Sequence, residues 1–159
     1  GGWDKYFGRI NPRFMSLETF HRNMAFTLYH ADMMPLMRVG ESRVESLGGG
    51  LYRVQVDLRN ERLMPTVTAK AKENRVVRPD ILTVDADVEV VAAGWVEDRN
   101  RSGPTEIIDQ HNLKRIIVRS SHPGRTTRTI EYLVRGSGAM EVTYSTVKGG
   151  TVSTTIRLR

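Results

Sequence analysis

The alternation of apolar and polar residues changes its period once along the chain. Between residues 16 and 34 apolar side chains recur every three or four positions, which is the spacing of an α-helix. Ser16 suits the N-cap of this helix, and Pro35 cannot continue it. At about 100° of rotation per residue, the apolar positions fall into two stripes on roughly opposite sides. The stripes are Leu17, Phe20, Met24, Leu28 and Ala31 on one side and Phe26, Tyr29 and Met33 on the other. The sequence therefore predicts a helix that is buried from two sides.

After Pro35 the period falls to two, which is typical of β-strands. The clearest strand is 51–59, and the weaker alternation of 67–72 predicts another. We expect a linker at 40–43 and a tight turn at the three glycines 48–50. Glycine turns also join the last three strands, which we expect to form a meander. The sequence therefore predicts a mainly β protein, an antiparallel β-sandwich of the immunoglobulin-like or transthyretin-like kind, with about seven or eight strands and one N-terminal α-helix.

Composition and charge add little to this picture except an uneven charge distribution. The chain has 159 residues, of which 39% are hydrophobic, and no cysteine, so disulfides and thiolate sites are excluded. No apolar run approaches the roughly 20 residues that span a bilayer, so we expect no membrane contact. The net charge of +6 resides in residues 99–159, because this part holds 11 Lys and Arg against 4 Asp and Glu. Arginines on outward strand faces explain this balance, and a site for polyanions is the alternative. Few aromatic residues lie among the charges, so we expect no nucleic acid.

The four histidines form no metal-binding motif. Those on the helix are nine positions apart and do not share a face, and the other two lie in or beside loops. They are His21, His30, His111 and His122. Asp85, Asp87 and Glu89 alternate on one strand, where a solvated acidic face is favoured over a weak calcium site. We expect no catalytic residue, no metal site and no cofactor in this chain, since no nucleophile motif or phosphate-binding glycine loop is present either.

Residues 1–15 combine glycines with aromatic side chains, as in a loop packed against a surface or lining a cleft. Together with the second helix stripe they provide candidate contacts with a further domain. These candidates are Trp3, Tyr6, Phe26, Tyr29 and Met33.

Four stretches of the chain resemble the C-terminal part of bacterial zinc carboxypeptidases, hydrolases of the carboxypeptidase A type of metallopeptidase. They are GGWDKYFGRINPRF, ETFHRNMAFTLYHADMMP, LGGGLYRVQVDLRNERLMPT and GRTTRTIEYLVRGSGAMEVTYSTVKGGTV. The resemblance covers most of the chain and is weakest around residues 73–112.

The resemblance implies that a catalytic domain precedes this chain. In that family a His-x-x-Glu pair and a later His hold one zinc ion, and a glutamate acts as general base. The glutamate precedes a loop and the last helix of the domain, which would correspond here to 1–15 and 16–34. No residue of this chain matches a zinc ligand or the base, so the base is expected upstream of Gly1. Residues 1–39 would then end the catalytic domain, and 43–159 would form a C-terminal β-sandwich accessory domain.

The expected function is therefore that of a non-catalytic domain that stabilises a zinc metallocarboxypeptidase or positions its substrate. Zinc is expected in the parent protein, which would be exported to the periplasm or the medium; nothing in this chain itself assigns a compartment. The expected partner is the upstream catalytic domain. In its absence the helix would dock on its own sandwich or on another copy, giving a homodimer through the exposed helix face.

Two other functions remain open at this stage. One is a stand-alone binding module for an anionic glycan, a cell-wall polymer or a peptide, which the basic half of the chain would serve. The other, the least favoured, is an independent hydrolase that uses the scattered histidines.

Overall fold

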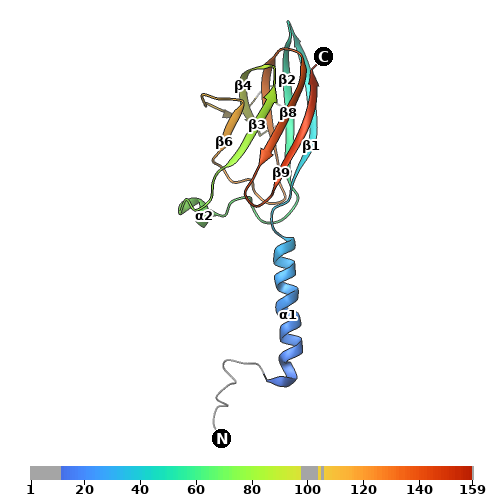
Figure 1. Ribbon diagram of the computed structural model, residues 1–159, viewed down its shortest axis with the longest axis vertical. Helices are drawn as coiled ribbons and strands as arrows, with labels where there is room; N and C mark the ends of the chain where they lie inside the picture. The colour runs from blue at the N-terminus through green and yellow to red at the C-terminus, as the bar shows by residue number, and fades with distance from the viewer. Residues whose placement is uncertain (1–11, 98–103, 105, 159) are drawn as a thin grey trace. The chain divides into compact units, whose positions relative to one another are not determined.

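The chain divides into two compact units, Gly1–Met33 and Met34–Arg159, which we describe separately. The structure is a computed structural model, and it describes residues 12–97, 104 and 106–158. The first unit holds helix α1 (Arg13–Asp32), and the second holds helix α2 (Ala69–Glu73) and the strands β1 to β9 (Figure 1). In the described part of the chain, no helix is both long enough and apolar enough to cross a bilayer.

Helix α1 confirms the predicted helix, although it begins three residues early. Pro12 is its N-cap, with φ at −53°. A proline suits a helix start because its missing N–H group would have no partner there. Ser16 instead lies in the first turn, where its hydroxyl donates to the Pro12 carbonyl at 3.1 Å. The prediction of Ser16 as N-cap was therefore wrong. The helix ends at Asp32, ahead of Pro35, as expected.

The second unit is a sandwich of two antiparallel sheets (Figure 1). One sheet has the order β1 (Met37–Gly48), β2 (Leu51–Asn60), β7 (Thr127–Arg135), β4 (Glu89–Val96), β5 (Glu106–Ile107). The other has the order β6 (Arg115–Val118), β3 (Asp80–Ala86), β8 (Gly138–Ser145), β9 (Thr151–Leu158). The predicted fold class, a mainly β antiparallel sandwich with an N-terminal helix, is confirmed, with nine strands among the described residues.

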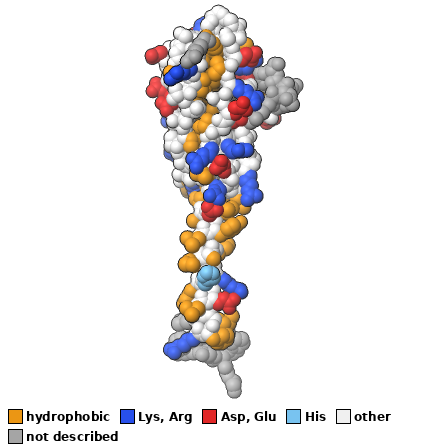
Figure 2. All heavy atoms as spheres, turned by 90° about the vertical axis from the view of Figure 1, so that its right-hand side faces the viewer, with side chains coloured by type: hydrophobic (Ala, Val, Ile, Leu, Met, Phe, Trp, Pro, Cys, Tyr) orange, Lys and Arg blue, Asp and Glu red, His pale blue; other side chains and the backbone are white. Residues whose placement is uncertain are grey.

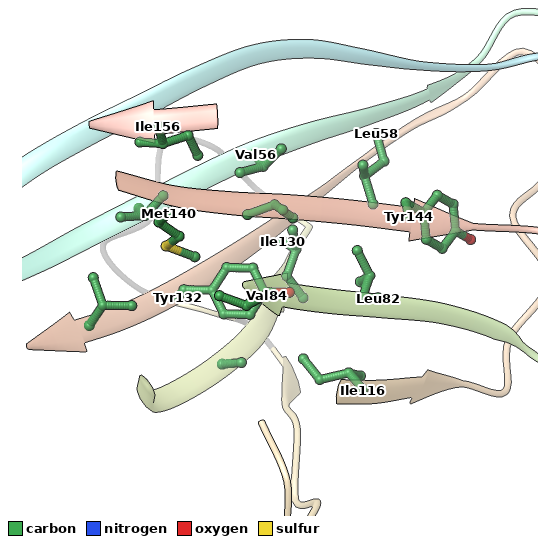
Figure 3. Packing of buried hydrophobic residues seen from close by; sticks show 14 of the residues in the cluster. Val56, Leu58, Leu82, Val84, Ile116, Ile130, Tyr132, Met140, Tyr144 and Ile156 are labelled. Atoms are coloured by element: carbon green, nitrogen blue, oxygen red, sulfur yellow. The ribbon is translucent and has the colours of Figure 1, made fainter. Parts of the chain in front are cut away.

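The core lies between the two sheets and is built from alternate residues of their strands. On β2, β7 and β8 every second side chain points inward, as expected for strands with one wet face. The inward residues of these strands are Tyr52, Val54, Val56, Leu58, Ile130, Tyr132, Val134, Met140, Val142 and Tyr144, none more than 8% exposed. Figure 3 shows Tyr132 and Tyr144 within this packed core. The apolar residues whose alternation predicted β2 are therefore the ones that β2 contributes to the core.

The predicted meander of the last three strands was wrong in one of its two steps. β8 and β9 do form a hairpin, but β7 pairs with β2 and β4 in the opposite sheet. The chain crosses between the sheets at Gly136 and Gly138, whose φ angles of 132° and 123° favour glycine. A glycine turn shows where the chain reverses, but distant strands decide which sheet the next strand joins.

Two further local predictions were wrong. Residues 67–72 do not form a strand, because Thr68 caps α2 by accepting a hydrogen bond from the Ala71 N–H at 3.3 Å. The alanines and lysines that suggested alternation are also good helix formers. The expected linker at 40–43 belongs to β1, with a bulge between Val39 and Ser42. The turn at 48–50 is confirmed, and its three glycines have positive φ.

We predict that Tyr132→Phe leaves the free energy of unfolding unchanged or raises it by about 1 kcal/mol, because the buried Tyr132 hydroxyl has no hydrogen-bond partner among the described residues. Tyr144→Phe is the matched control. It removes a 3.0 Å hydrogen bond to Asp80, and we expect it to lower the free energy of unfolding by about 1–2 kcal/mol. Urea unfolding of the three proteins measures both effects. Equal destabilisation by the two substitutions would contradict this account of the core.

Candidate functional site

Helix α1 displays large apolar side chains on both of the predicted stripes. None of its residues is buried. Eight large apolar side chains on it are between 43% and 86% exposed, namely Phe14, Met15, Leu17, Phe20, Met24, Phe26, Leu28 and Tyr29. Figure 2 shows hydrophobic side chains spread along the surface of α1. Contiguous exposed apolar surface of this kind marks an interaction site.

The structure describes three of the five candidate interface residues. Phe26 and Tyr29 are exposed, at 67% and 59%, and Met33 is half-buried at the C-cap of α1. The Phe26 ring lies 6.0 Å from that of His30, centroid to centroid. Trp3 and Tyr6 lie outside the described residues. The contact of these side chains with a further domain stays a prediction.

The side chain of Asn60 ties the start of the sandwich to two loops. Asn60 is fully buried, and its carbonyl oxygen accepts from the backbone N–H groups of Leu36 and Arg62, both at 3.3 Å. Its amide nitrogen donates to the carbonyls of Met64 at 2.8 Å and Pro123 at 3.2 Å. Four hydrogen bonds from one buried amide fix where the chain enters β1. The alternation of apolar and polar residues predicted the strand 51–59 but gave no signal for Asn60.

A second buried polar cluster joins the loops at the same end of the sandwich. The carboxylate of Asp80 accepts from the Thr66 hydroxyl at 2.6 Å and from the Tyr144 hydroxyl at 3.0 Å. Thr66 in turn accepts from the backbone N–H of His122 at 3.0 Å. His122 is 0% exposed and Asp80 is 1% exposed. Groups so enclosed hold the loops together at this end of the sandwich.

Burial disfavours the charged forms of both titratable groups in this cluster. Burial raises the pKa of Asp80 above its ordinary value, against the hydrogen bonds from Thr66 and Tyr144, which lower it. Burial likewise lowers the pKa of His122. The His122 Nε2 lies 3.2 Å from the Thr126 carbonyl, which only accepts, so Nε2 carries the proton. Nδ1 is buried without a partner among the described residues, so an added proton there would have no acceptor.

No group of three or more possible metal ligands lies close together within the part of the chain that the structure describes. Of the histidines, His122 is buried and the other three are exposed. The acidic run at 85–89 was wrongly placed on one strand face. Asp85 is the second-last residue of β3, which ends at Ala86, and Glu89 begins β4 in the other sheet. Glu89 lies 3.5 Å from Arg135, as an exposed ion pair.

A hollow of about 360 Å³ is lined by residues of β4, β5 and β7, which belong to one sheet, and by the loop before β7; Trp95 and Arg128 are among them. The Arg128 guanidinium lies 4.0 Å from the centroid of the Trp95 ring and donates to the Ser120 hydroxyl at 2.8 Å. The ring is therefore covered, and it offers no flat platform to a sugar or a base. Ser121 hydrogen bonds to the backbone of Val67 instead of facing a ligand.

A family model, that of a domain of unknown function (DUF8731), matches residues 37–157, more than half of the chain. The match begins at the first residue of β1 and extends into β9, so α1 lies outside it. Comparisons with curated proteins and with solved structures found no match.

We predict that the free energy of unfolding falls as the pH drops from about 7 towards 5.5. In this range His122 takes up a proton in the unfolded chain but stays neutral in the folded protein, where burial lowers its pKa. The slope is at most about 1.4 kcal/mol per pH unit, the limit for one proton. Asp80 acts in the opposite sense: its raised pKa makes stability fall as the pH rises above the ordinary value of 3.8. The His122 contribution is therefore measured as the difference between the wild type and His122→Gln in urea unfolding.

His111→Gln serves as the control, since this side chain is exposed. It should keep the wild-type pH dependence, whereas His122→Gln should flatten it. Identical pH profiles for the wild type and His122→Gln would show that His122 is not held neutral by burial.

Proposed function

We propose that this chain, which belongs to the DUF8731 family of domains of unknown function, is a non-catalytic accessory domain of a zinc metallocarboxypeptidase-like protein. In this proposal the β-sandwich is the accessory domain, and α1 is the last helix of the preceding catalytic domain. The observation that carries the proposal is that α1 exposes apolar side chains on both faces and buries none.

The energetics of α1 favour a partner. A lone helix of 20 residues is marginally stable in water, and most helices in proteins are stabilised by packing. Burying eight large apolar side chains contributes on the order of 10 kcal/mol before the entropy of association is subtracted. The sandwich, in contrast, has a continuous core of its own. The helix therefore needs a partner surface that buries its apolar side chains, as the core of the sandwich buries those of the strands.

The identity of that partner rests on the resemblance of four stretches to the C-terminal part of bacterial zinc carboxypeptidases. The zinc ion and the general base would belong to the catalytic domain. The contribution of this chain would be to bury an apolar face of that domain with α1. Residues 33–36 connect α1 to β1, and the backbone N–H of Leu36 in this link donates to the side chain of Asn60. A domain packed on α1 would thus be tied to a rigid sandwich through a short link, which suits a stabilising role.

The full-length polypeptide encoded by the gene provides the test. Its sequence upstream of Gly1 should contain a His-x-x-Glu pair, a later His and a glutamate close to Gly1. In that polypeptide Phe26→Gln combined with Tyr29→Gln should lower the melting temperature of the catalytic domain by several degrees, because two apolar contacts are lost. In the present chain alone the same substitutions should leave the unfolding of the sandwich unchanged, since both side chains are exposed. Scanning calorimetry measures both.

Arg22→Gln is the control on the same helix, because its exposed ion pair with Glu18 contributes little. Two results would contradict the proposal. One is an upstream sequence without the zinc ligands. The other is a full-length protein in which Phe26→Gln and Tyr29→Gln abolish a dimer and leave the catalytic domain unaffected, which would assign α1 to a second copy of the chain.

A further inference from the structure

Among the described residues, a hollow of about 350 Å³ beside α2 is lined by four cationic residues and by no acidic one. The cations are Lys72, Arg75, Arg78 and Arg119. We call this site the cationic hollow. Figure 1 shows α2 at the end of the sandwich where β3 begins. The other large side chains that line it are aliphatic, so the hollow pairs an apolar surface with a concentration of positive charge.

Most of the positive charge of the cationic hollow has no ion pair among the described residues, although Arg78 interacts electrostatically with Asp80. The ion pairs of the described chain include none with Lys72, Arg75 or Arg119, whereas the neighbouring Lys70 is paired with Glu73 at 3.0 Å. Arg78 is held in place, because it donates to the Ser145 hydroxyl at 3.0 Å and to the Pro79 carbonyl at 3.3 Å. Four like charges around one hollow repel one another, and an anion would relieve that repulsion.

The segment that forms the hollow is fixed at its base. All of the lining residues except Arg119 come from residues 67–79. Thr66 and Asp80 flank this segment, and their side chains are joined by the buried 2.6 Å hydrogen bond. Val67 is held by two further bonds to the Ser121 hydroxyl, at 3.1 and 2.7 Å. A segment closed in this way presents a pre-organised surface, which lowers the entropy lost on binding.

The lining selects among anionic ligands. Its uncharged members, Val67, Val77 and Pro79, are aliphatic. Among the described residues, the lining offers no aromatic ring on which a base or a sugar would stack, and no neutral hydrogen-bonding side chain for sugar hydroxyls. A ligand that satisfies both parts of the hollow carries an aliphatic group next to clustered negative charge. Acidic peptides with aliphatic side chains have this chemistry.

We propose that the cationic hollow binds an acidic peptide segment, with an aliphatic side chain against Val67, Val77 and Pro79 and carboxylates on the surrounding cations. The site does not depend on the proposed accessory function, because it lies wholly within the sandwich unit.

Arg75 offers an informative substitution. It follows the C-cap of α2 with φ at 53°, a conformation in which glycine is favoured over any residue with a side chain. Arg75→Gly therefore removes a positive charge and relaxes the backbone together. Arg125 has the same φ of 53°, is exposed and lies outside the hollow. Arg125→Gly is thus the matched control for Arg75→Gly, because it removes the same charge and relaxes the same backbone conformation.

The experiment measures the fluorescence anisotropy of a labelled peptide in which glutamate and leucine alternate, titrated with the full chain at low salt. We expect Arg75→Gly to weaken binding about threefold or more, and Arg75→Gly with Arg119→Ala about tenfold, because each change removes one cation from the contact. Arg125→Gly should change the affinity by less than about twofold. A peptide of glutamate alone, of equal length, should bind more weakly than the alternating one. Added salt should weaken binding of both.

Three results would overturn the proposal. Equal losses in Arg75→Gly and Arg125→Gly would mean that net charge alone attracts the peptide. Equal affinity for the two peptides would mean that the aliphatic lining takes no part. Displacement of the peptide by a sulfated oligosaccharide or by phosphatidylserine vesicles, at concentrations where the glutamate peptide does not compete, would assign the hollow to another class of ligand. Thermal melts of both glycine variants verify that they are folded.

Discussion

The packing of alternate side chains between two antiparallel sheets is the constraint on which the rest of this structure depends. Tyr132 on β7 and Tyr144 on β8 are fully buried from opposite sheets. The strands they belong to each have a neighbour on both sides, so the centre of the sandwich is closed by strands alone. Helix α1 contributes no buried residue. Its exposed apolar stripes lead to the proposed role of α1 as an attached element of a larger protein.

The polar groups buried at one end of the sandwich give the loops there a defined shape. Asn60 binds the segment before β1 to the loops around Met64 and Pro123. Asp80 and Thr66 close the segment that carries α2 and the cationic hollow. Loops held by buried hydrogen bonds are pre-organised for contact with a partner, whereas loops held only by their ends would lose more entropy on binding. Both proposed interaction sites are thus related to the strand core. Among the residues that the structure describes, the core contains none of α1. The segment that carries the cationic hollow is attached to the core through Thr66 and Asp80.

Sequence patterns predicted what depends on near neighbours and failed where distant residues decide. The α1 stripes, the alternation in β2 and the turn at 48–50 all depend on residues close in the chain, and all three elements are present. The assignment of β7 to one sheet and β8 to the other depends on pairing with β2 and β3, which no local turn signal contains. Residues 67–72 illustrate a conflict, since their alternation suits a strand while their composition and the Thr68 cap suit a helix. The buried cluster at Asp80 could not be predicted, because its hydrogen bonds span from 14 to 64 residues.

Our central proposal, that the sandwich is complete by itself whereas α1 packs on a further domain, is tested most directly by hydrogen exchange of backbone amides in the monomeric chain. Strands whose side chains are buried on the core face should exchange slowest, near the limit of global unfolding. We therefore expect strong protection in β2, β7 and β8, and exchange in α1 that is orders of magnitude faster, close to that of an unprotected peptide. Protection of α1 equal to that of β7 in a monomer would contradict the account, because it would show that the helix already has all the contacts it needs.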